Sequence, residues 1–102
     1  MTQLRKPAVS GQFYPSNPAM LKQMIMGFFE KTAVAANGAA PQLKALIVPH
    51  AGYIYSGPVA AYGYKLLKGL DQTKKWKILL LGLSHFIPVV GAAASSYSKW
   101  ET

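Results

Sequence analysis

The sequence predicts an α/β fold that contains a βαβ unit of a mostly parallel sheet with flanking helices. Two short apolar runs, residues 44–48 and 77–83, lack the polar alternation of a half-buried strand. Such runs are typical of parallel strands that are covered on both faces. A helical period lies between them, carried by Val59, Tyr62, Gly63, Leu66, Leu67 and Leu70. The crossover is therefore expected to be right-handed, with the two strands parallel.

Composition indicates one small globular domain. The chain has 102 residues, of which 51% are hydrophobic and 14% charged, and this balance argues against disorder. It has no cysteine, which excludes a disulfide or a Cys-ligated zinc site within the chain. The net charge of +8 is scattered, and only Lys74, Lys75 and Lys77 cluster. A solvated basic face is the first interpretation, and nucleic-acid binding is the weakest alternative.

The predicted helices have recognisable starts. Asn17-Pro18 supplies an N-cap and a proline at the first helical position. An apolar stripe at helical spacing follows and is expected to be core, formed by Leu21, Met24, Ile25, Phe28 and Phe29. Ser56-Gly57-Pro58 supplies a similar cap and an early proline for the crossover helix.

The remaining segments are predicted to connect these elements. Residues 5–16 are expected to be extended or looped, residues 32–42 a surface linker and residues 71–75 a polar turn. Residues 91–98 suit a weak strand. Two parallel strands and two helices cannot cover both faces of a sheet. We therefore expect the amino-terminal part of a larger α/β protein, or a sheet that another chain completes.

Membrane insertion is not expected. The amino terminus lacks the apolar run of a secretory signal, and Ser84, His85 and Pro88 interrupt the most apolar stretch, residues 78–94. A soluble, cytoplasmic protein is the default prediction.

Two histidines, His50 and His85, follow the two predicted strands and are the only histidines in the chain. Ligands bind beyond the carboxyl ends of strands in open α/β sheets, so both side chains are expected at one crevice. Neutral imidazole is a common ligand for iron, copper and zinc. Two unrelated strand caps are the alternative, and the equivalent positions slightly favour a metal site.

A third ligand is not evident in the sequence. The three acidic residues are Glu30 beside the apolar stripe, Asp71 in the turn at the opposite end of the sheet, and Glu101 in the tail. None is placed to complete a two-histidine, one-carboxylate triad. The missing ligand is therefore expected outside this chain.

Hydroxyl groups follow His50 on the same predicted loop. Tyr53, Tyr55 and Ser56 are candidate substrate-binding residues, while Gly52 and Gly57 allow a tight backbone path. An equally favoured interpretation is that the tyrosines wedge the loop against the following helix. The loop lacks a phosphate-binding glycine pattern.

Three motifs in order resemble the Memo-like proteins, the family of the mediator of ErbB2-driven cell motility and its microbial relatives. The opening segment, residues 5–15, reads RKPAVSGQFYP. The hallmark, residues 49–58, reads PHAGYIYSGP, and residues 81–85 read LGLSH. The resemblance covers residues 1–102 as the amino-terminal part of a single Memo-like α/β domain.

This resemblance implies a fold related to the class III extradiol dioxygenases, which bind non-haem iron through two histidines and a glutamate. In Memo-like proteins a cysteine takes the third position. His50 and His85 match the family's two histidines, whereas the cysteine matches no residue here. Leu83 departs from the proline that usually precedes the Ser/Ala-His pair, which leaves His85 less securely matched than His50.

The implied function is a metal-binding protein with redox or dioxygenase-like activity that depends on iron or copper, although whether it is an enzyme stays open. The alternative is a non-catalytic module that binds phosphorylated or anionic peptides in the same crevice. A small-molecule ligand is also compatible with the site. Microbial members of the family are associated with a radical-SAM partner protein and a third, small protein.

Overall fold

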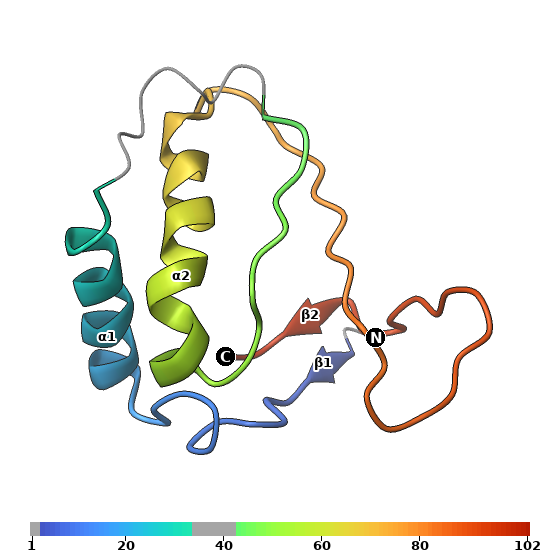
Figure 1. The fold of residues 1–102 in the computed structure, drawn as a ribbon. Helices are drawn as coiled ribbons and strands as arrows, with labels where there is room; N and C mark the ends of the chain where they lie inside the picture. Colours follow the sequence, from blue (N-terminus) through green and yellow to red (C-terminus); the bar gives the residue numbers. More distant parts are fainter. Residues whose placement is uncertain (1–2, 34–42) are drawn as a thin grey trace. The chain divides into compact units, whose positions relative to one another are not determined.

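A computed structural model describes residues 3–33 and 43–102 of the chain. In chain order, the elements are β1 (Leu4–Arg5), α1 (Pro18–Glu30), α2 (Tyr53–Lys65), the 3-10 helix η2 (Leu66–Gly69) and β2 (Lys99–Trp100), shown in Figure 1. The chain divides into two compact units. The helical unit comprises Ala8–Thr73, and the extended unit comprises Met1–Pro7 with Lys74–Thr102.

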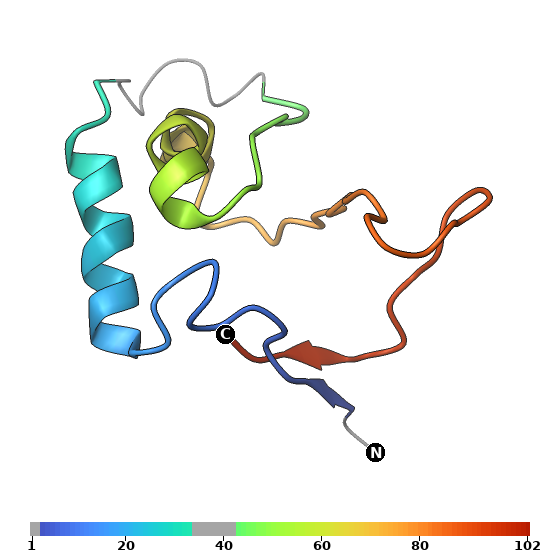
Figure 2. The same ribbon diagram turned by 60° about the horizontal axis from the view of Figure 1, so that its bottom comes forward.

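Helix α1 begins where the sequence predicts. The Asn17 side chain accepts a hydrogen bond of 3.1 Å from the Met20 amide, and Pro18 occupies the first turn. Such a cap satisfies one of the amides that a helix start leaves without a partner. The predicted apolar stripe is half-buried and faces α2, which lies beside α1 in Figures 1 and 2.

Small residues of α2 allow the two helices to approach closely. Ala60 and Ala61 are buried, and the Phe28 ring of α1 packs directly over Gly57. A Cβ atom at Gly57 would collide with that ring. Dispersion contacts strengthen with such close approach, so the absent side chain at position 57 stabilises the pair.

A lysine of α2 caps the end of α1. The Lys65 ammonium donates hydrogen bonds to the carbonyl oxygens of Phe29 at 3.0 Å and Thr32 at 2.6 Å. A helix carboxyl end exposes carbonyls with partial negative charge, which a cation stabilises. The buried Thr32 hydroxyl donates to the Phe28 carbonyl at 2.7 Å.

Helix α2 begins earlier than predicted. Its first helical residue is Tyr53, so Ser56 is not the cap and Pro58 lies inside the helix. The amides of Tyr55 and Ser56 both donate to the Gly52 carbonyl, at 2.9 and 3.0 Å, which closes the first turn ahead of the proline. The predicted helical period continues through η2 to Leu70.

Neither predicted strand forms a β-ladder. Residues 44–48 and 77–83 carry no strand assignment, which corrects the proposed strand positions of the βαβ unit. The parallel pair consists instead of β1 and β2, with Leu4 opposite Lys99 and Arg5 opposite Trp100. A run of residues becomes a strand only when a neighbour supplies backbone partners, and the described residues supply none for these two runs.

The unit that contains the strands is held by surface contacts. The Arg5 guanidinium lies 4.5 Å from the centre of the Trp100 ring, and Lys6 pairs with Glu101 at 2.8 Å. Strand β2 directly follows the predicted weak strand, residues 91–98, which is itself unassigned. Neither α1 nor α2 combines the length and the apolar character that a helix needs to cross a membrane, and the described residues contain no other helix that does.

The connecting segments agree with expectation where they are described. Residues 5–16 are mainly looped. In the turn at residues 71–75, the Asp71 carboxylate accepts hydrogen bonds from the Thr73 hydroxyl at 2.6 Å and from the Thr73 amide at 2.9 Å. These bonds form the predicted polar turn and lower the pKa of Asp71 below its usual value. The predicted linker lies mostly outside the described residues.

Candidate functional site

The segment that carries His50 runs along α2. Residues 43–50 form an extended coil beside this helix in Figure 1. Val48 lies against Gly63, where a Cβ atom would stand only 2.6 Å from the Val48 Cγ1 methyl. The missing side chain at position 63 therefore sets how closely the segment that leads to His50 approaches the helix.

Ser56 ties the loop after His50 to the helix. Its hydroxyl, buried at 6% exposure, donates to the Ala51 carbonyl at 2.7 Å and lies 3.4 Å from the Gly52 carbonyl oxygen. A buried hydroxyl is stable only with such partners. Ser56 thus holds the backbone next to the histidine, and its predicted role in binding substrate has no direct support from this placement.

A loop near the amino terminus supports the same site. The Phe13 carbonyl accepts a 2.8 Å hydrogen bond from the Tyr53 amide, and the Tyr14 and Tyr53 rings lie 5.3 Å apart at a 42° tilt. Gly11 makes this loop possible because its φ of +80° is unfavourable for other residues. Its amide donates to the Tyr14 carbonyl at 2.8 Å.

Phe13 and Tyr14 lie in residues 5–16, which the sequence predicts only as an extended or looped segment. The Ser-Gly-Gln turn at residues 10–12 is the signal that could have revealed a compact loop. Its contact with residues 52–53 brings together two motifs separated by about forty positions, and single-sequence periodicity cannot indicate such a pairing.

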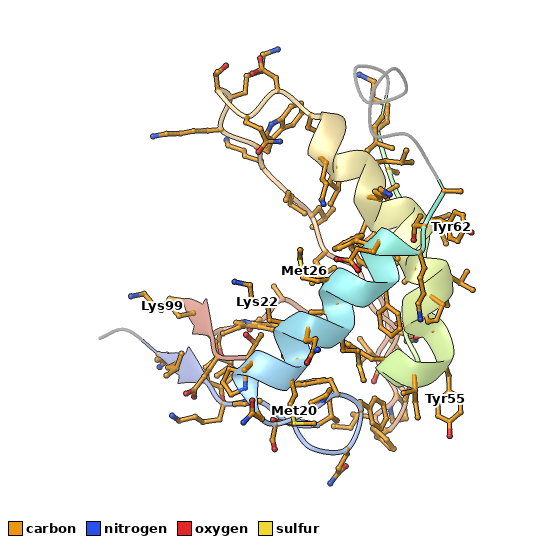
Figure 3. All side chains as sticks on the ribbon, turned by 90° about the vertical axis from the view of Figure 1, so that its left-hand side faces the viewer. Met20, Lys22, Met26, Tyr55, Tyr62 and Lys99 are labelled. Carbon is orange, nitrogen blue, oxygen red and sulfur yellow. The ribbon has the colours of Figure 1, made fainter. Side chains whose placement is uncertain are left out.

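Tyr53 and Tyr55, in the first turn of α2, differ in environment. Tyr53 is half-buried, and burial, followed by the charges of Tyr14 and Tyr64, raises its pKa above the usual 10.0. Tyr55 is 78% exposed and points away from α2 in Figure 3. Of the three predicted substrate-binding residues, Tyr55 has the side chain most accessible to a ligand.

His85 lies in the other compact unit, in an exposed bend. Its ring meets that of Phe86 edge to face, with centroids 6.5 Å apart. The Ser84 hydroxyl donates to the Ile87 carbonyl, which closes the bend around the histidine. His50 and His85 are both exposed in the structure, and each follows an extended apolar run.

The donors available for a metal are suitable in kind and insufficient in number. Two imidazoles match the preferences of iron and copper. Residues 3–33 and 43–102 nevertheless contain no group of three His, Cys, Asp or Glu side chains that could hold an ion. Glu101 pairs with Lys6, and Asp71 caps its own turn. Any coordination by the histidines therefore needs donors from beyond the described residues.

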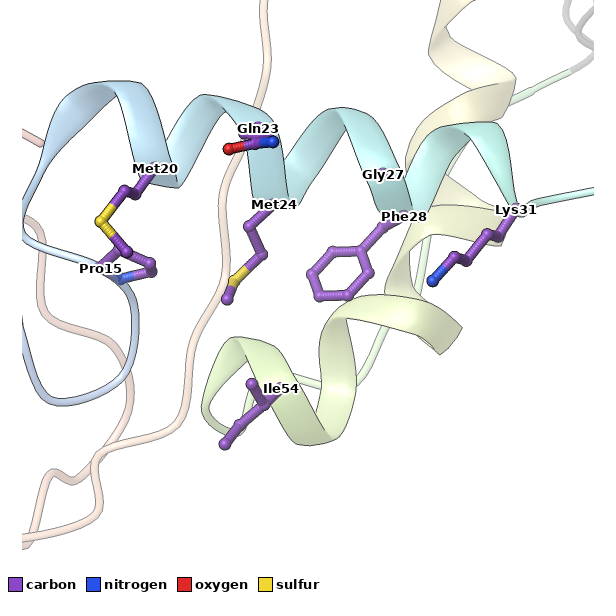
Figure 4. Close-up of a pocket in the computed structure, with 8 residues that line it drawn as sticks. All are labelled: Pro15, Met20, Gln23, Met24, Gly27, Phe28, Lys31 and Ile54. Carbon is purple, nitrogen blue, oxygen red and sulfur yellow. The ribbon is translucent and has the colours of Figure 1, made fainter.

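An open groove lies elsewhere in the helical unit. It encloses about 380 Å³ between α1 and the start of α2. Its lining is Pro15, Met20, Gln23, Met24, Gly27, Phe28, Lys31 and Ile54. Figure 4 shows Met24 and Phe28 pointing toward the α2 side of this groove. The methionine and phenylalanine stripe is therefore only partly covered, rather than a closed core.

Comparison with known proteins identifies relatives of the chain. The profile of the family described as Memo-like protein matches residues 5–102. A MEMO1 family protein of Methanocaldococcus jannaschii is 37% identical over 90 residues, covering 83% of this chain and 31% of the relative. Another from Nitrosopumilus maritimus is 35% identical over 101 residues, covering 97% of the chain and 36% of the relative.

A third relative, the MEMO1 family protein of Pyrobaculum arsenaticum, is 40% identical over 103 residues, again covering 97% of this chain and 36% of the relative. The chain thus spans about a third of the length of these curated relatives. No solved structure gives a significant match.

Proposed function

The chain belongs to the Memo-like protein family, and on that premise we propose that it binds an iron or copper ion through His50 and His85. The observation that carries the proposal is that each histidine is exposed at the end of an extended apolar run, where a loop begins. These are the only two histidines of the chain. For the fold, we propose the class III extradiol dioxygenase-like fold that the family resemblance implies.

The loop around His50 supports this proposal because several independent bonds fix its backbone. Ser56 holds Ala51, and Phe13 holds Tyr53. A metal-ligating side chain whose supporting residues are already ordered loses little conformational entropy when the metal binds. The contacts of these residues thus orient the segment that carries the imidazole.

Two histidines leave most coordination positions of such an ion for other donors. A bound iron or copper ion would supply redox or oxygen-activating chemistry at those positions. The residues of this chain would supply two neutral nitrogen donors and the exposed Tyr55 hydroxyl, which follows His50 in sequence. The third protein ligand would come from polypeptide outside the described residues.

Metal analysis tests the proposal. The purified chain is loaded with Fe(II) under anaerobic conditions or with Cu(II), freed of excess ion by gel filtration, and its metal content is measured. We expect His50→Ala and His85→Ala each to lose the bound ion, while the control Lys22→Ala, at an exposed position of α1, retains it. Unchanged metal content in both histidine variants would overturn the proposal.

An alternative function is the binding of phosphorylated or anionic peptides without turnover. The exposed Tyr55 ring and the net charge of +8 favour it. Peptide binding that survives both metal removal and the double substitution of His50 and His85 would support this alternative. Loss of peptide binding together with the metal would instead assign the peptide to the metal site.

The remaining functional expectations are also proposals. A small molecule is a possible substrate class at the same site, and association with a radical-SAM protein follows from the family resemblance. A cytoplasmic location is the corresponding proposal for the compartment. Nucleic-acid binding is the weakest of these proposals. A nucleic-acid affinity that does not change with salt concentration would dismiss it.

A further inference from the structure

The open groove between α1 and the start of α2 is formed within a single compact unit. Met20, Met24 and Phe28 supply its apolar wall on α1, and Ile54 lies across from them on α2 (Figure 4). All of its lining residues belong to the helical unit. Its volume of about 380 Å³ lies in the range of pockets that hold small ligands.

One edge of the groove is polar. Gln23, Gly27 and Lys31 recur every four residues, so they share one edge of α1, and all three line the groove. Gln23 and Lys31 are exposed. The interior of a folded domain covers apolar side chains and leaves lysine and glutamine in water. This edge therefore marks the solvent side of α1, from which a ligand can enter.

Lys31 gives the groove a positive charge at one end. None of the lining residues is acidic. Figure 4 shows the Lys31 side chain directed toward the side of the groove that holds the Phe28 ring. Lys31 forms no ion pair with the part of the chain that the structure describes. The charge of the groove thus favours an anionic group on the ligand.

The carbonyls at the end of α1 do not occupy the Lys31 ammonium. A helix carboxyl end attracts a cation, and here the Lys65 ammonium takes that role by donating to the Phe29 and Thr32 carbonyls. Lys31 contributes only its backbone amide to the cap, as a donor to the Gly27 carbonyl at 3.3 Å. Its ammonium therefore remains available to a ligand.

The groove is long relative to its width. From Met20 to Lys31 the chain advances by roughly 16 Å along the axis of α1, at about 1.5 Å per residue. The two methionines are flexible, so they adapt to the irregular surface of an alkyl chain. An elongated apolar groove with a cation at one end fits a linear chain with an anionic head better than a compact ring.

We propose that this groove binds a linear fatty carboxylate. The alkyl chain lies along Met20, Met24 and Phe28, and the carboxylate pairs with the Lys31 ammonium. An exposed ion pair contributes little free energy, so burial of the chain supplies most of the affinity and Lys31 sets the direction of binding. The site does not use His50 or His85 and is independent of the proposed metal.

Gly27 offers a way to close the groove without damaging the helix. No atom lies within 4 Å of the position that a Cβ would take there. Gly27→Leu therefore fills part of the groove, and leucine has a higher helix propensity than glycine. We expect the thermal stability of the helices to be maintained or raised, and the affinity for dodecanoate to fall by roughly tenfold or more.

Calorimetric titration of the chain with dodecanoate, below the concentration at which it forms micelles, tests the proposal. We expect one dodecanoate per chain. Lys31→Gln should weaken binding by roughly two- to fivefold. The control Lys22→Gln removes an exposed lysine of α1 that does not line the groove, and it should leave the affinity unchanged.

Dodecyltrimethylammonium has the same alkyl chain with a cationic head. It should bind more weakly than dodecanoate, and Lys31→Gln should narrow the difference. Absence of dodecanoate binding, equal affinities of Lys31→Gln and Lys22→Gln, or unchanged affinity in a helical Gly27→Leu variant would overturn the proposal. If Gly27→Leu fails to fold, the comparison of the two lysine variants decides the question.

Discussion

The helical unit and the extended unit bury apolar side chains to very different degrees. In Ala8–Thr73, Phe28 fits over Gly57, Val48 fits against Gly63 and Lys65 caps α1. In Lys74–Thr102, the leucines of residues 78–83 remain exposed. The difference arises because a helix makes its backbone bonds internally and needs only one packing partner, whereas a strand needs neighbours for both backbone and side chains.

The largest effect is expected at the helix contact. Gly57→Ala places a methyl group against the Phe28 ring and should lower the free energy of unfolding by about 2 kcal/mol through overpacking. Thermal unfolding followed by helical circular dichroism measures it. Gly27→Ala is the matched control, because nothing lies within 4 Å of that Cβ position, and it should stabilise the unit by about 1 kcal/mol. Equal effects of the two substitutions would contradict the packing described for the helices.

The next effect is expected at the cap of α1. Lys65→Met removes two hydrogen bonds to backbone carbonyls and should cost about 1–2 kcal/mol. Urea unfolding compares this variant with Lys22→Met, which changes an exposed lysine of α1, the helix that Lys65 caps. The cap has no energetic role if the two variants unfold at the same urea concentration.

A smaller effect is expected in the extended unit. Trp100→Ala removes the contact with Arg5, which should contribute about 0.5–1 kcal/mol at an exposed site. Exchange of the Glu101 amide, which donates to the Arg5 carbonyl at 3.0 Å, should then accelerate by roughly two- to fivefold. Lys6→Met removes only an exposed ion pair and should change exchange less. The reverse order would contradict the account of this unit.

The smallest effect concerns alkaline pH. The raised pKa of Tyr53 means that its neutral form is favoured in the folded chain. Its contribution to stability is fully present below the unfolded value of 10.0 and is lost as pH rises through the folded pKa. Tyr53→Phe should reduce this alkaline loss in urea titrations, and Tyr14→Phe should move the pKa of Tyr53 back toward 10.0. An unchanged loss in Tyr53→Phe would show that other groups cause it.

Local signals predicted the helices well. The Asn17-Pro18 cap and the apolar stripe fix α1 because both act within a few residues. The start of α2 was displaced because Ser56 bonds backward to the Ala51 carbonyl instead of capping forward. Whether Ser56 caps the helix therefore depends on the loop that precedes α2 and not on the serine alone.

Tertiary pairing was not predictable to the same degree. The runs at residues 44–48 and 77–83 have strand composition, yet neither has a ladder partner among the described residues. The contact of Phe13 with Tyr53 joins distant segments, and periodicity carries no information about it. The positions of His50 and His85 at the ends of apolar runs follow from sequence, while their use as ligands remains a prediction.

We expect His50 and His85 to share one metal ion, and the metal stoichiometry of single and double variants shows whether they do. We expect one Fe(II) or Cu(II) ion per chain, lost to the same extent in His50→Ala, in His85→Ala and in the double variant. Such equal losses arise when two ligands act as one site. Retention of half the ion in each single variant, with complete loss only in the double variant, would show two separate sites and contradict the claim.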